Sequence, residues 1–163
     1  MKTIYLIRHA KAIPEHSDMP DEKRTLVEEG IEQTEKICDY LSKNRCKCQH
    51  IYTSNAVRSL ETARILAKGF KSSTKEIIIE PRLYSGTTDA YLDVLYRQPK
   101  EVTHLAIVGH NPNVTDFANC FLSEMINNLP TSAVLCIEID TDNWTDIDLA
   151  THRKRFLITP KTL

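Results

Sequence analysis

Two apolar runs in this sequence each lead into a histidine. Residues 3–7 run into Arg8 and His9, and residues 105–108 run through a glycine into His110. Short apolar runs that are rich in Ile, Leu and Val predict buried strands. Ligands gather at the carboxyl ends of strands in an open α/β sheet, so we expect both histidines to lie at one edge of such a sheet.

Arg58 brings a second guanidinium to the same edge. It falls in the first turn of a helix that we expect directly after a strand at 50–53. Two guanidinium groups suit a phosphoryl dianion because each donates two parallel hydrogen bonds, and a helix N-terminus adds oriented N–H groups. A neutral histidine in this cluster is able to attack phosphorus in line. The pattern therefore predicts a phosphate site with a histidine nucleophile.

Each feature also has a plainer explanation when it is taken alone. An Arg-His pair at a strand end is more often an ordinary surface pair. The segment 109–112, Gly-His-Asn-Pro, is common in strand-to-helix turns, where Asn111 would cap the helix and Pro112 would occupy its first turn. The sequence shows that the four groups could converge, and their convergence is a hypothesis for the structure to test.

Composition limits the classes of function. The 163 residues carry 21 Lys+Arg and 22 Asp+Glu, and this balance gives no reason to expect a nucleic-acid partner. No apolar run approaches the length of a membrane span, and the start of the chain lacks the pattern of a signal peptide. The five cysteines are an odd number, which favours reduced thiols. We therefore expect a cytoplasmic protein that binds neither nucleic acid nor membrane.

Cys46, Cys48 and His50 form the one pattern that suggests a metal. Their spacing is tighter than the usual zinc pattern, and no second pair of ligands follows. We therefore expect two ordinary thiols before a strand, with neither a metal nor a cofactor.

Strands and helices alternate through most of the chain, which predicts an α/β fold with a largely parallel sheet. The last two strands should form an antiparallel pair at one side. We expect strands at 2–7, 50–53, 77–79, 104–108, 133–139 and 155–158, and helices at 25–42, 56–69, 89–97 and from Pro112 onward.

Local signals add detail to two of these regions. Thr25 and Glu28 match a capping box at the start of the first helix. Residues 12–23 and 81–88 should be loops. The buried face of the first helix should carry Val27, Ile31, Thr34, Cys38 and Leu41.

The motifs around these residues resemble the signatures of the histidine phosphatase superfamily, which has the phosphoglycerate-mutase-like fold. Residues 6–10, Leu-Ile-Arg-His-Ala, resemble its Arg-His-Gly signature. Residues 53–63 resemble its Ser-x-x-x-Arg-x-x-x-Thr-Ala signature, and residues 108–111 resemble the third. The motifs come in the same order with fitting spacing, and together they span most of the chain.

The short chain and the segment Asp21-x-x-Arg24-x-Leu26 are most similar to the SixA-type phosphohistidine phosphatases. The resemblance implies a single three-layer α/β/α domain over residues 1–163, with a mostly parallel central sheet and an antiparallel edge.

The resemblance also implies roles for individual residues. His9 would be the nucleophile that becomes phosphorylated, Arg8, Arg58 and His110 would hold the phosphoryl oxygens, and Arg24 would line the rim. No metal would be required, because the guanidinium groups supply the positive charge.

The sequence departs from the family pattern at two places. Ala10 replaces the commoner glycine, and Lys11 after it either adds charge near the phosphate or lies solvated at the surface. Mutases and phosphoesterases of the family carry a glutamate as general acid in the loop after the third strand. That position holds Ser85 here, and Glu80 lies too early in the loop.

The missing glutamate bears on the substrate. An alkoxide leaving group needs a proton from a positioned acid, which contributes roughly 10²–10⁴-fold in rate. The imidazole of phosphohistidine leaves as a neutral group and needs less help, so the site favours P–N bonds. His16, Asp18, Asp21 or Asp89 could still approach the site from loops.

Three functions are therefore open. The first is removal of phosphate from a phosphohistidine on a partner protein, such as a histidine-containing phosphotransfer-type domain. The second is hydrolysis of a small phosphorylated substrate, a phosphomonoester or sugar phosphate. The third is a module that binds a phosphorylated ligand without turnover, although pure binding leaves His9 without a purpose.

Overall fold

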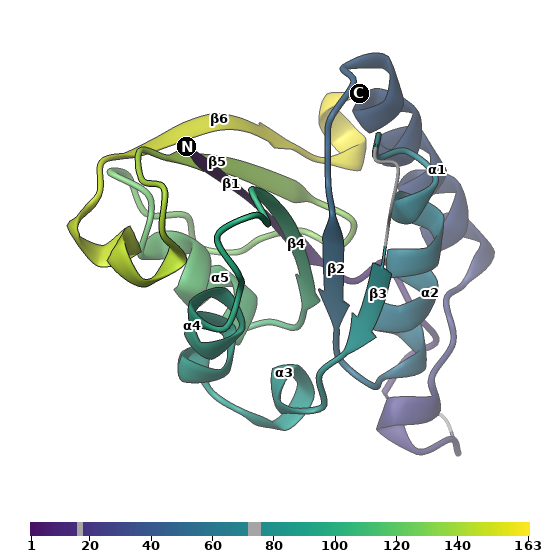
Figure 1. Ribbon diagram of the computed structural model, residues 1–163. Helices are drawn as coiled ribbons and strands as arrows, with labels where there is room; N and C mark the ends of the chain where they lie inside the picture. Colours follow the sequence, from purple (N-terminus) through teal and green to yellow (C-terminus); the bar gives the residue numbers. More distant parts are fainter. Residues whose placement is uncertain (16–17, 72–75) are drawn as a thin grey trace.

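A twisted six-stranded sheet runs through the middle of the protein in this computed structural model, which describes residues 1–15, 18–71 and 76–163 (Figure 1). The strand order is β3-β2-β4-β1-β5-β6. The strands are β1 (Lys2–Arg8), β2 (His50–Thr53), β3 (Glu76–Ile79), β4 (His104–Gly109), β5 (Val134–Ile139) and β6 (His152–Ile158).

Strands β3, β2, β4 and β1 are parallel, β5 pairs with β1 in the antiparallel sense, and β6 pairs with β5 likewise. The mostly parallel sheet with an antiparallel edge is thus confirmed. In register, Arg8 lies opposite Gly109, and Thr53 lies opposite Val108. The carboxyl ends of β1, β2 and β4 therefore finish side by side, at the edge where the sequence places its candidate residues.

Helices cover both faces of the sheet and complete the three layers that we expected. The helices α1 (Glu28–Lys43) and α2 (Val57–Ala67) pack together on one face, and α4 (Thr88–Tyr96) and α5 (Asn113–Asn119) lie on the other (Figure 1). The prediction of a three-layer α/β/α arrangement is confirmed.

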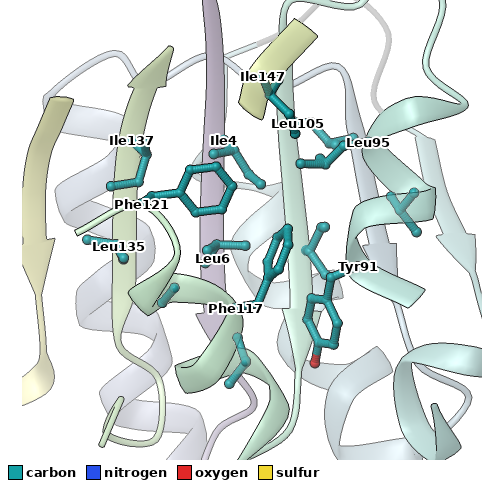
Figure 2. Packing of buried hydrophobic residues seen from close by; sticks show 14 of the residues in the cluster. Ile4, Leu6, Tyr91, Leu95, Leu105, Phe117, Phe121, Leu135, Ile137 and Ile147 are labelled. Carbon is teal, nitrogen blue, oxygen red and sulfur yellow. The ribbon is translucent and has the colours of Figure 1, made fainter. Parts of the chain in front are cut away.

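Strand β1 is anchored in both cores because its side chains alternate between the faces. Ile4 and Leu6 join the cluster beneath α4 and α5, which Figure 2 shows with Tyr91 and Phe117. On the opposite face, neighbouring β1 residues join a second cluster, which includes Tyr5, Ile7, Ile37, Leu41, Ile51, Ala63 and Leu66. Each large side chain buried in this way contributes roughly 1.5–3 kcal/mol. The carboxyl end of β1 therefore projects from a rigid support.

Short helices interrupt segments that the sequence predicts as loops. The 3₁₀ helix η1 (Asp21–Lys23) lies in the first of these segments, where residues 16–17 fall outside the described part of the chain. The helix α3 (Arg82–Ser85) lies in the second, and α4 begins at Thr88, one residue earlier than expected. Two further 3₁₀ helices are η2 (Trp144–Leu149) and η3 (Pro160–Thr162).

The predicted capping box of α1 is wrong. The helix begins at Glu28, its cap position is Val27, and no side chain caps it. The backbone before the helix pairs with residues 11–13 instead. Ile13 N donates to the Thr25 carbonyl at 2.9 Å, and Val27 N donates to the Lys11 carbonyl at 3.1 Å. This short pairing ties the segment after the first histidine to the start of α1.

The predicted buried face of α1 is partly wrong. Thr34 and Leu41 are buried as expected, but Ile31 is 37% exposed and Ile37 is fully buried in its place. Gly30 explains the rotation, since a Cβ there would lie 2.2 Å from the Lys11 carbonyl oxygen. The helix approaches the 11–13 segment through this glycine, and that contact sets which side of α1 faces the sheet.

The cysteine pattern forms part of the core. Cys46 and Cys48 are buried, and the Cys48 thiol donates to the carbonyl of His50. Among the residues that the structure describes, no group of three or more His, Cys, Asp or Glu side chains could hold a metal ion. The helices of the described ranges include none that is long and apolar enough to cross a membrane.

Candidate active site

The ends of β1 and β4 bring the two histidines together. The pairing of the strands continues past Arg8, where His9 N donates to the Gly109 carbonyl at 3.1 Å. The rings of His9 and His110 lie 5.0 Å apart between centroids, at an angle of 49°. The convergence proposed from the sequence is therefore present in the fold.

The surroundings of His9 determine which ring nitrogen carries the proton. Arg58 Nε lies 3.3 Å from His9 Nε2, and a guanidinium only donates, so Nε2 is the acceptor. The proton is on Nδ1, which donates to the carbonyl of Ala10 at 2.8 Å. Burial lowers the pKa of His9 to about 4, against the hydrogen bond to Ala10, and the charge of Arg58 lowers it further. His9 is thus a neutral imidazole at pH 7 with its lone pair on Nε2.

His110 is held in the opposite tautomer. Arg58 Nη2 lies 3.3 Å from His110 Nδ1, which must accept, so Nε2 carries the proton and donates to Ser54 Oγ at 2.6 Å. Ser59 Oγ is also near Nε2, at 3.2 Å. Burial lowers the pKa of His110 to about 3, and the neighbouring His9 and Arg58 add to this effect.

Gly109 fixes the position of the second histidine. A Cβ at this residue would lie 2.0 Å from the hydroxyl oxygen of Tyr91. The same hydroxyl lies 3.3 Å from the backbone nitrogen of His110, which donates to it. The close approach of a buried ring to the strand requires glycine, and it locks the turn that carries His110.

Arg58 is the centre of the hydrogen-bond network. It is 5% exposed, and besides its contacts with the two rings it donates from Nη1 to the Asp21 carbonyl at 2.8 Å and from Nη2 to Asp21 Oδ2 at 3.0 Å. Thr62 holds the first turn of α2 against β1, because its hydroxyl donates to the Arg58 carbonyl at 2.7 Å and accepts from Ala10 N at 3.0 Å.

Arg8 has one buried hydrogen-bond donor without a protein partner among the described residues. Its Nη1 donates to the carbonyl of Leu129 at 3.2 Å. Its Nε is buried and has no hydrogen-bond partner among the described residues. A buried guanidinium N–H without a partner is costly, and the role of Arg8 in holding a phosphoryl oxygen stays a prediction.

An acid lies inside the cluster, although the sequence shows no matched run of acids beside it. Asp21, one of the loop carboxylates named as possible neighbours, accepts from Arg24 Nε at 2.9 Å and from the Tyr84 hydroxyl at 2.6 Å, in addition to Arg58. Burial raises the pKa of this carboxyl, but the hydrogen bonds from Tyr84, Arg24 and Arg58 outweigh it and hold the pKa well below its usual range. Asp21 is ionised at neutral pH.

Tyr84 is a site residue that the sequence analysis missed. Its ring meets the ring of His110 edge-on at 5.4 Å, and the Arg58 guanidinium lies 5.9 Å from its centroid. The sequence feature that could have identified Tyr84 is its position one residue before Ser85, in the loop that resembles the family's acid-bearing loop. Ser54 and Ser59 were missed as well, because a serine near a helix start has many ordinary roles.

Arg24 and Lys11, the two other cations named from the sequence, differ in burial and in their partners. Arg24 is 7% exposed, donates from Nη1 to the Ile13 carbonyl at 2.6 Å, and reaches the cluster through Asp21. Lys11 is exposed, and its Nζ forms an ion pair with Glu29 at 2.5 Å. Arg24 thus belongs to the hydrogen-bond network of the site, whereas the Lys11 side chain pairs with Glu29 on the surface of α1.

The other acids named from the sequence are either paired elsewhere or exposed. Glu80 forms an ion pair with Arg97 at 2.7 Å and accepts from Arg82 N at 3.2 Å. Asp18 and Asp89 are exposed. His16 lies outside the described residues.

The first half of the chain matches a family profile. Residues 4–85 match the histidine phosphatase superfamily (branch 1), which covers Arg8, His9 and Arg58. No curated protein matches the chain at a significant level.

Solved structures show the same fold, among them three of interest. A protein from Agrobacterium tumefaciens, provisionally identified as the phosphohistidine phosphatase SixA, has a TM-score of 0.82 at 24% identity, over 98% of each chain. The protein histidine phosphatase SixA in complex with tungstate has a TM-score of 0.77 at 18% identity, over 98% of each chain. A mycobacterial glucosyl-3-phosphoglycerate phosphatase in complex with VO3 has a TM-score of 0.67 at 12% identity, over 96% of this chain and 98% of the other. The expected phosphoglycerate-mutase-like fold is confirmed.

Proposed function

Because the chain belongs to the histidine phosphatase superfamily (branch 1) and is a phosphatase-type hydrolase, we propose that it removes phosphate from phosphohistidine on a partner protein. The observation that carries the proposal is the neutral His9, whose Nε2 lone pair lies among Arg58, Arg8 and His110 at the sheet edge. A phosphorylated histidine-containing phosphotransfer-type domain is the partner class that this chemistry fits.

The first chemical step transfers the phosphoryl group to His9. The phosphoryl oxygens take over donors of Arg58 and the unpartnered Nε of Arg8. As the phosphoryl group binds, Arg58 Nε gives up its bond to His9 and the lone pair on Nε2 becomes available. Nε2 then forms a bond to phosphorus while the P–N bond of the substrate breaks, and the electron pair goes to the leaving imidazole. The Nδ1–H bond to Ala10 stabilises the positive charge that develops on the ring of His9.

The second step returns the enzyme to its starting state. Water forms the new P–O bond, the bond to His9 Nε2 breaks, and the proton of the water passes to solvent. The guanidinium groups of Arg8 and Arg58 stabilise the charge on the equatorial oxygens in both steps, so the chain's own residues supply the positive charge that the reaction needs.

The state of the two carboxylates Glu80 and Asp21 supports a P–N substrate. Among the described residues, Glu80 is paired with Arg97, and Asp21 is ionised, so neither holds a proton for a leaving alkoxide. A substrate with an imidazole leaving group avoids the roughly 10²–10⁴-fold loss that a missing acid causes.

Small phosphorylated substrates are the second candidate. The fold similarity to a glucosyl-3-phosphoglycerate phosphatase covers 96% of this chain, and the same phosphoryl-binding groups would serve either leaving group. The ring of Tyr84 meets that of His110 edge-on, and its hydroxyl, which donates to Asp21, is the proton-bearing group that an ester would need to use.

The proposal is tested by mixing the protein with a phosphorylated histidine-containing phosphotransfer domain. The domain should lose its phosphate, and rapid quenching without acid followed by mass spectrometry should find phosphate on His9. The His9→Ala variant should do neither. Equal loss of phosphate with both proteins would refute the assignment, and turnover of small phosphomonoesters alone would support the second candidate.

Two further parts of the proposal concern the protein as a whole. We place residues 1–163 in one histidine phosphatase domain, because one sheet contains strands from both ends of the chain. We place the protein in the cytoplasm on the odd number of its cysteines.

A further inference from the structure

Asp21 is the partly exposed acid that pairs with both buried arginines of the cluster, Arg58 and Arg24. Its side chain is 40% exposed, whereas those of Arg58 and Arg24 are 6% and 8% exposed. The carboxylate therefore lies between two buried guanidinium groups on one side and solvent on the other. Its acceptor positions are filled, because Arg24 Nε and Nη2 lie 2.9 Å and 2.8 Å from Oδ1 while Arg58 Nη2 and the Tyr84 hydroxyl donate to Oδ2, so a new donor is accepted only where one of these leaves.

The bonds of Asp21 overlap with those that a phosphoryl group needs. Arg58 Nη2 donates to Asp21 Oδ2 and also reaches His110 Nδ1, while Nε of the same side chain reaches His9. A phosphoryl group that binds Arg58 in front of His9 Nε2 therefore lies next to the Asp21 carboxylate. Two anions side by side repel one another, so this arrangement favours a substrate with a positive charge close to its phosphorus.

Phosphohistidine is a substrate that carries such a charge. The ring nitrogen that is not bonded to phosphorus is able to hold a proton, and the resulting imidazolium N–H needs an acceptor. When the P–N bond breaks, the electron pair goes to the nitrogen that held phosphorus, the proton stays on the other nitrogen, and a neutral imidazole leaves. No proton has to be delivered by the enzyme. An alkoxide or phenoxide, in contrast, leaves with a negative charge and is repelled by Asp21.

We propose that Asp21 determines the leaving-group specificity of this site: when Arg58 Nη2 turns to the phosphoryl group, Asp21 Oδ2 accepts the N–H of a substrate imidazolium instead, and the carboxylate disfavours anionic leaving groups. The inference rests on the proposed function and deepens it. Asp21 takes the place of the missing glutamate in a different way, because it stabilises a proton that the substrate already carries. Tyr84 fixes the carboxylate from the side of α3, through its 2.6 Å hydrogen bond to Oδ2.

The test compares two small substrates of opposite leaving-group charge on Asp21→Asn and the wild type. Phosphoimidazole has the P–N bond, and p-nitrophenyl phosphate has an activated phenoxide that needs no acid. We expect the ratio of kcat/KM for phosphoimidazole to kcat/KM for p-nitrophenyl phosphate to fall at least tenfold in Asp21→Asn. Glu22→Gln removes one charge from the neighbouring exposed position of η1 and should leave the ratio unchanged.

Each other outcome contradicts the inference. If both substrates lose the same factor in Asp21→Asn, the carboxylate only holds Arg58 in place. If the ratio is unchanged or rises, or if the wild type does not hydrolyse phosphoimidazole, Asp21 does not favour an imidazole. The proposed function fails separately, when the wild type hydrolyses phosphoimidazole but leaves a phosphorylated partner domain intact.

Discussion

The candidate active site has two halves that are held by different forces. One half sits on strand ends, where the sheet register fixes Arg8 and the backbone bond from His9 to Gly109 continues the ladder. The other half sits on the loops that carry η1 and α3, where Asp21 and Tyr84 are held by hydrogen bonds between side chains. The backbone of the strand half is packed in both cores, but Arg8, His9, Asp21 and Tyr84 are all partly exposed.

This difference separates reaction chemistry from substrate choice. A nucleophile has to be aimed within tenths of an ångström, and a strand packed in two cores provides that rigidity. Loops tolerate change and are where recognition groups are usually found. We infer that the strand half carries out the phosphoryl transfer that the family shares, while the loop half adapts this chain to its own leaving group.

Arg58→Lys should have the largest effect, because Arg58 joins the two halves. A lysine ammonium cannot reproduce a fork that reaches His9 and Asp21 at once. We expect kcat/KM to fall roughly 10²–10³-fold with little change in thermal stability. Arg64→Lys, at an exposed position of the same helix, is the matched control and should stay within about twofold. Full activity in Arg58→Lys would show that the halves act independently.

Gly109→Ala should break the strand half alone. The new methyl would meet the Tyr91 hydroxyl at 2.0 Å and its ring at 2.8 Å, so either the ring or the His110 turn has to move. We expect a loss of about 1–3 kcal/mol in unfolding free energy and a marked loss of turnover. Adding Tyr91→Phe should recover part of both. An unchanged melting temperature would show that the turn is less tightly packed than the structure indicates.

The two halves should also differ in their response to pH. The pKa values of His9 and His110 lie at about 4 and about 3, below the ordinary 6.5. Between pH 6.5 and the lowered pKa of each histidine, the unfolded chain binds a proton that the folded protein does not. The unfolding free energy therefore falls as the pH drops through this range. Lowering the pH from 7 to 5 should cost about 2 kcal/mol for each histidine. Denaturant titrations at the two pH values measure this loss.

The loop half should add nothing to the change in unfolding free energy between pH 7 and 5. The pKa of Asp21 is lowered from an ordinary value near 3.8, so its contribution to stability is lost only below about pH 4. The Asp21→Asn variant should therefore keep the wild-type slope between pH 7 and 5, whereas His110→Gln should flatten it. The opposite pattern would assign the acid sensitivity to the loops.

Lys11→Ala should have the smallest effect. The Lys11–Glu29 ion pair is exposed, and such pairs contribute about 0–1 kcal/mol to stability. We expect kcat/KM to change less than about twofold, measured beside Glu29→Gln as the matched loss of the other charge. A tenfold loss in Lys11→Ala alone would place its charge at the phosphate and support the alternative that the sequence left open.

The predictions from local patterns succeeded where one element decides the outcome. The strand at 2–7 and the strand at 104–108 were recognisable from apolar runs, and the residues after them were certain to lie at the same edge once the strands were parallel. The capping box of Thr25 and Glu28 failed because the backbone before α1 pairs with residues 11–13, a contact that local spacing does not reveal.

The sequence by itself indicated the α/β class, predicted Arg8, His9, Arg58 and His110 as the candidate site residues, and showed Ser85 at the family's acid position. Tertiary structure alone decided that Asp21 and Tyr84, 63 residues apart in the chain, share a hydrogen bond beside Arg58. The physical reason is that strand ends inherit their place from the sheet, whereas a loop side chain finds its partner only when separate elements have packed. The same packing placed Ile37 inside and Ile31 outside, because Gly30 brings α1 against the backbone of Lys11.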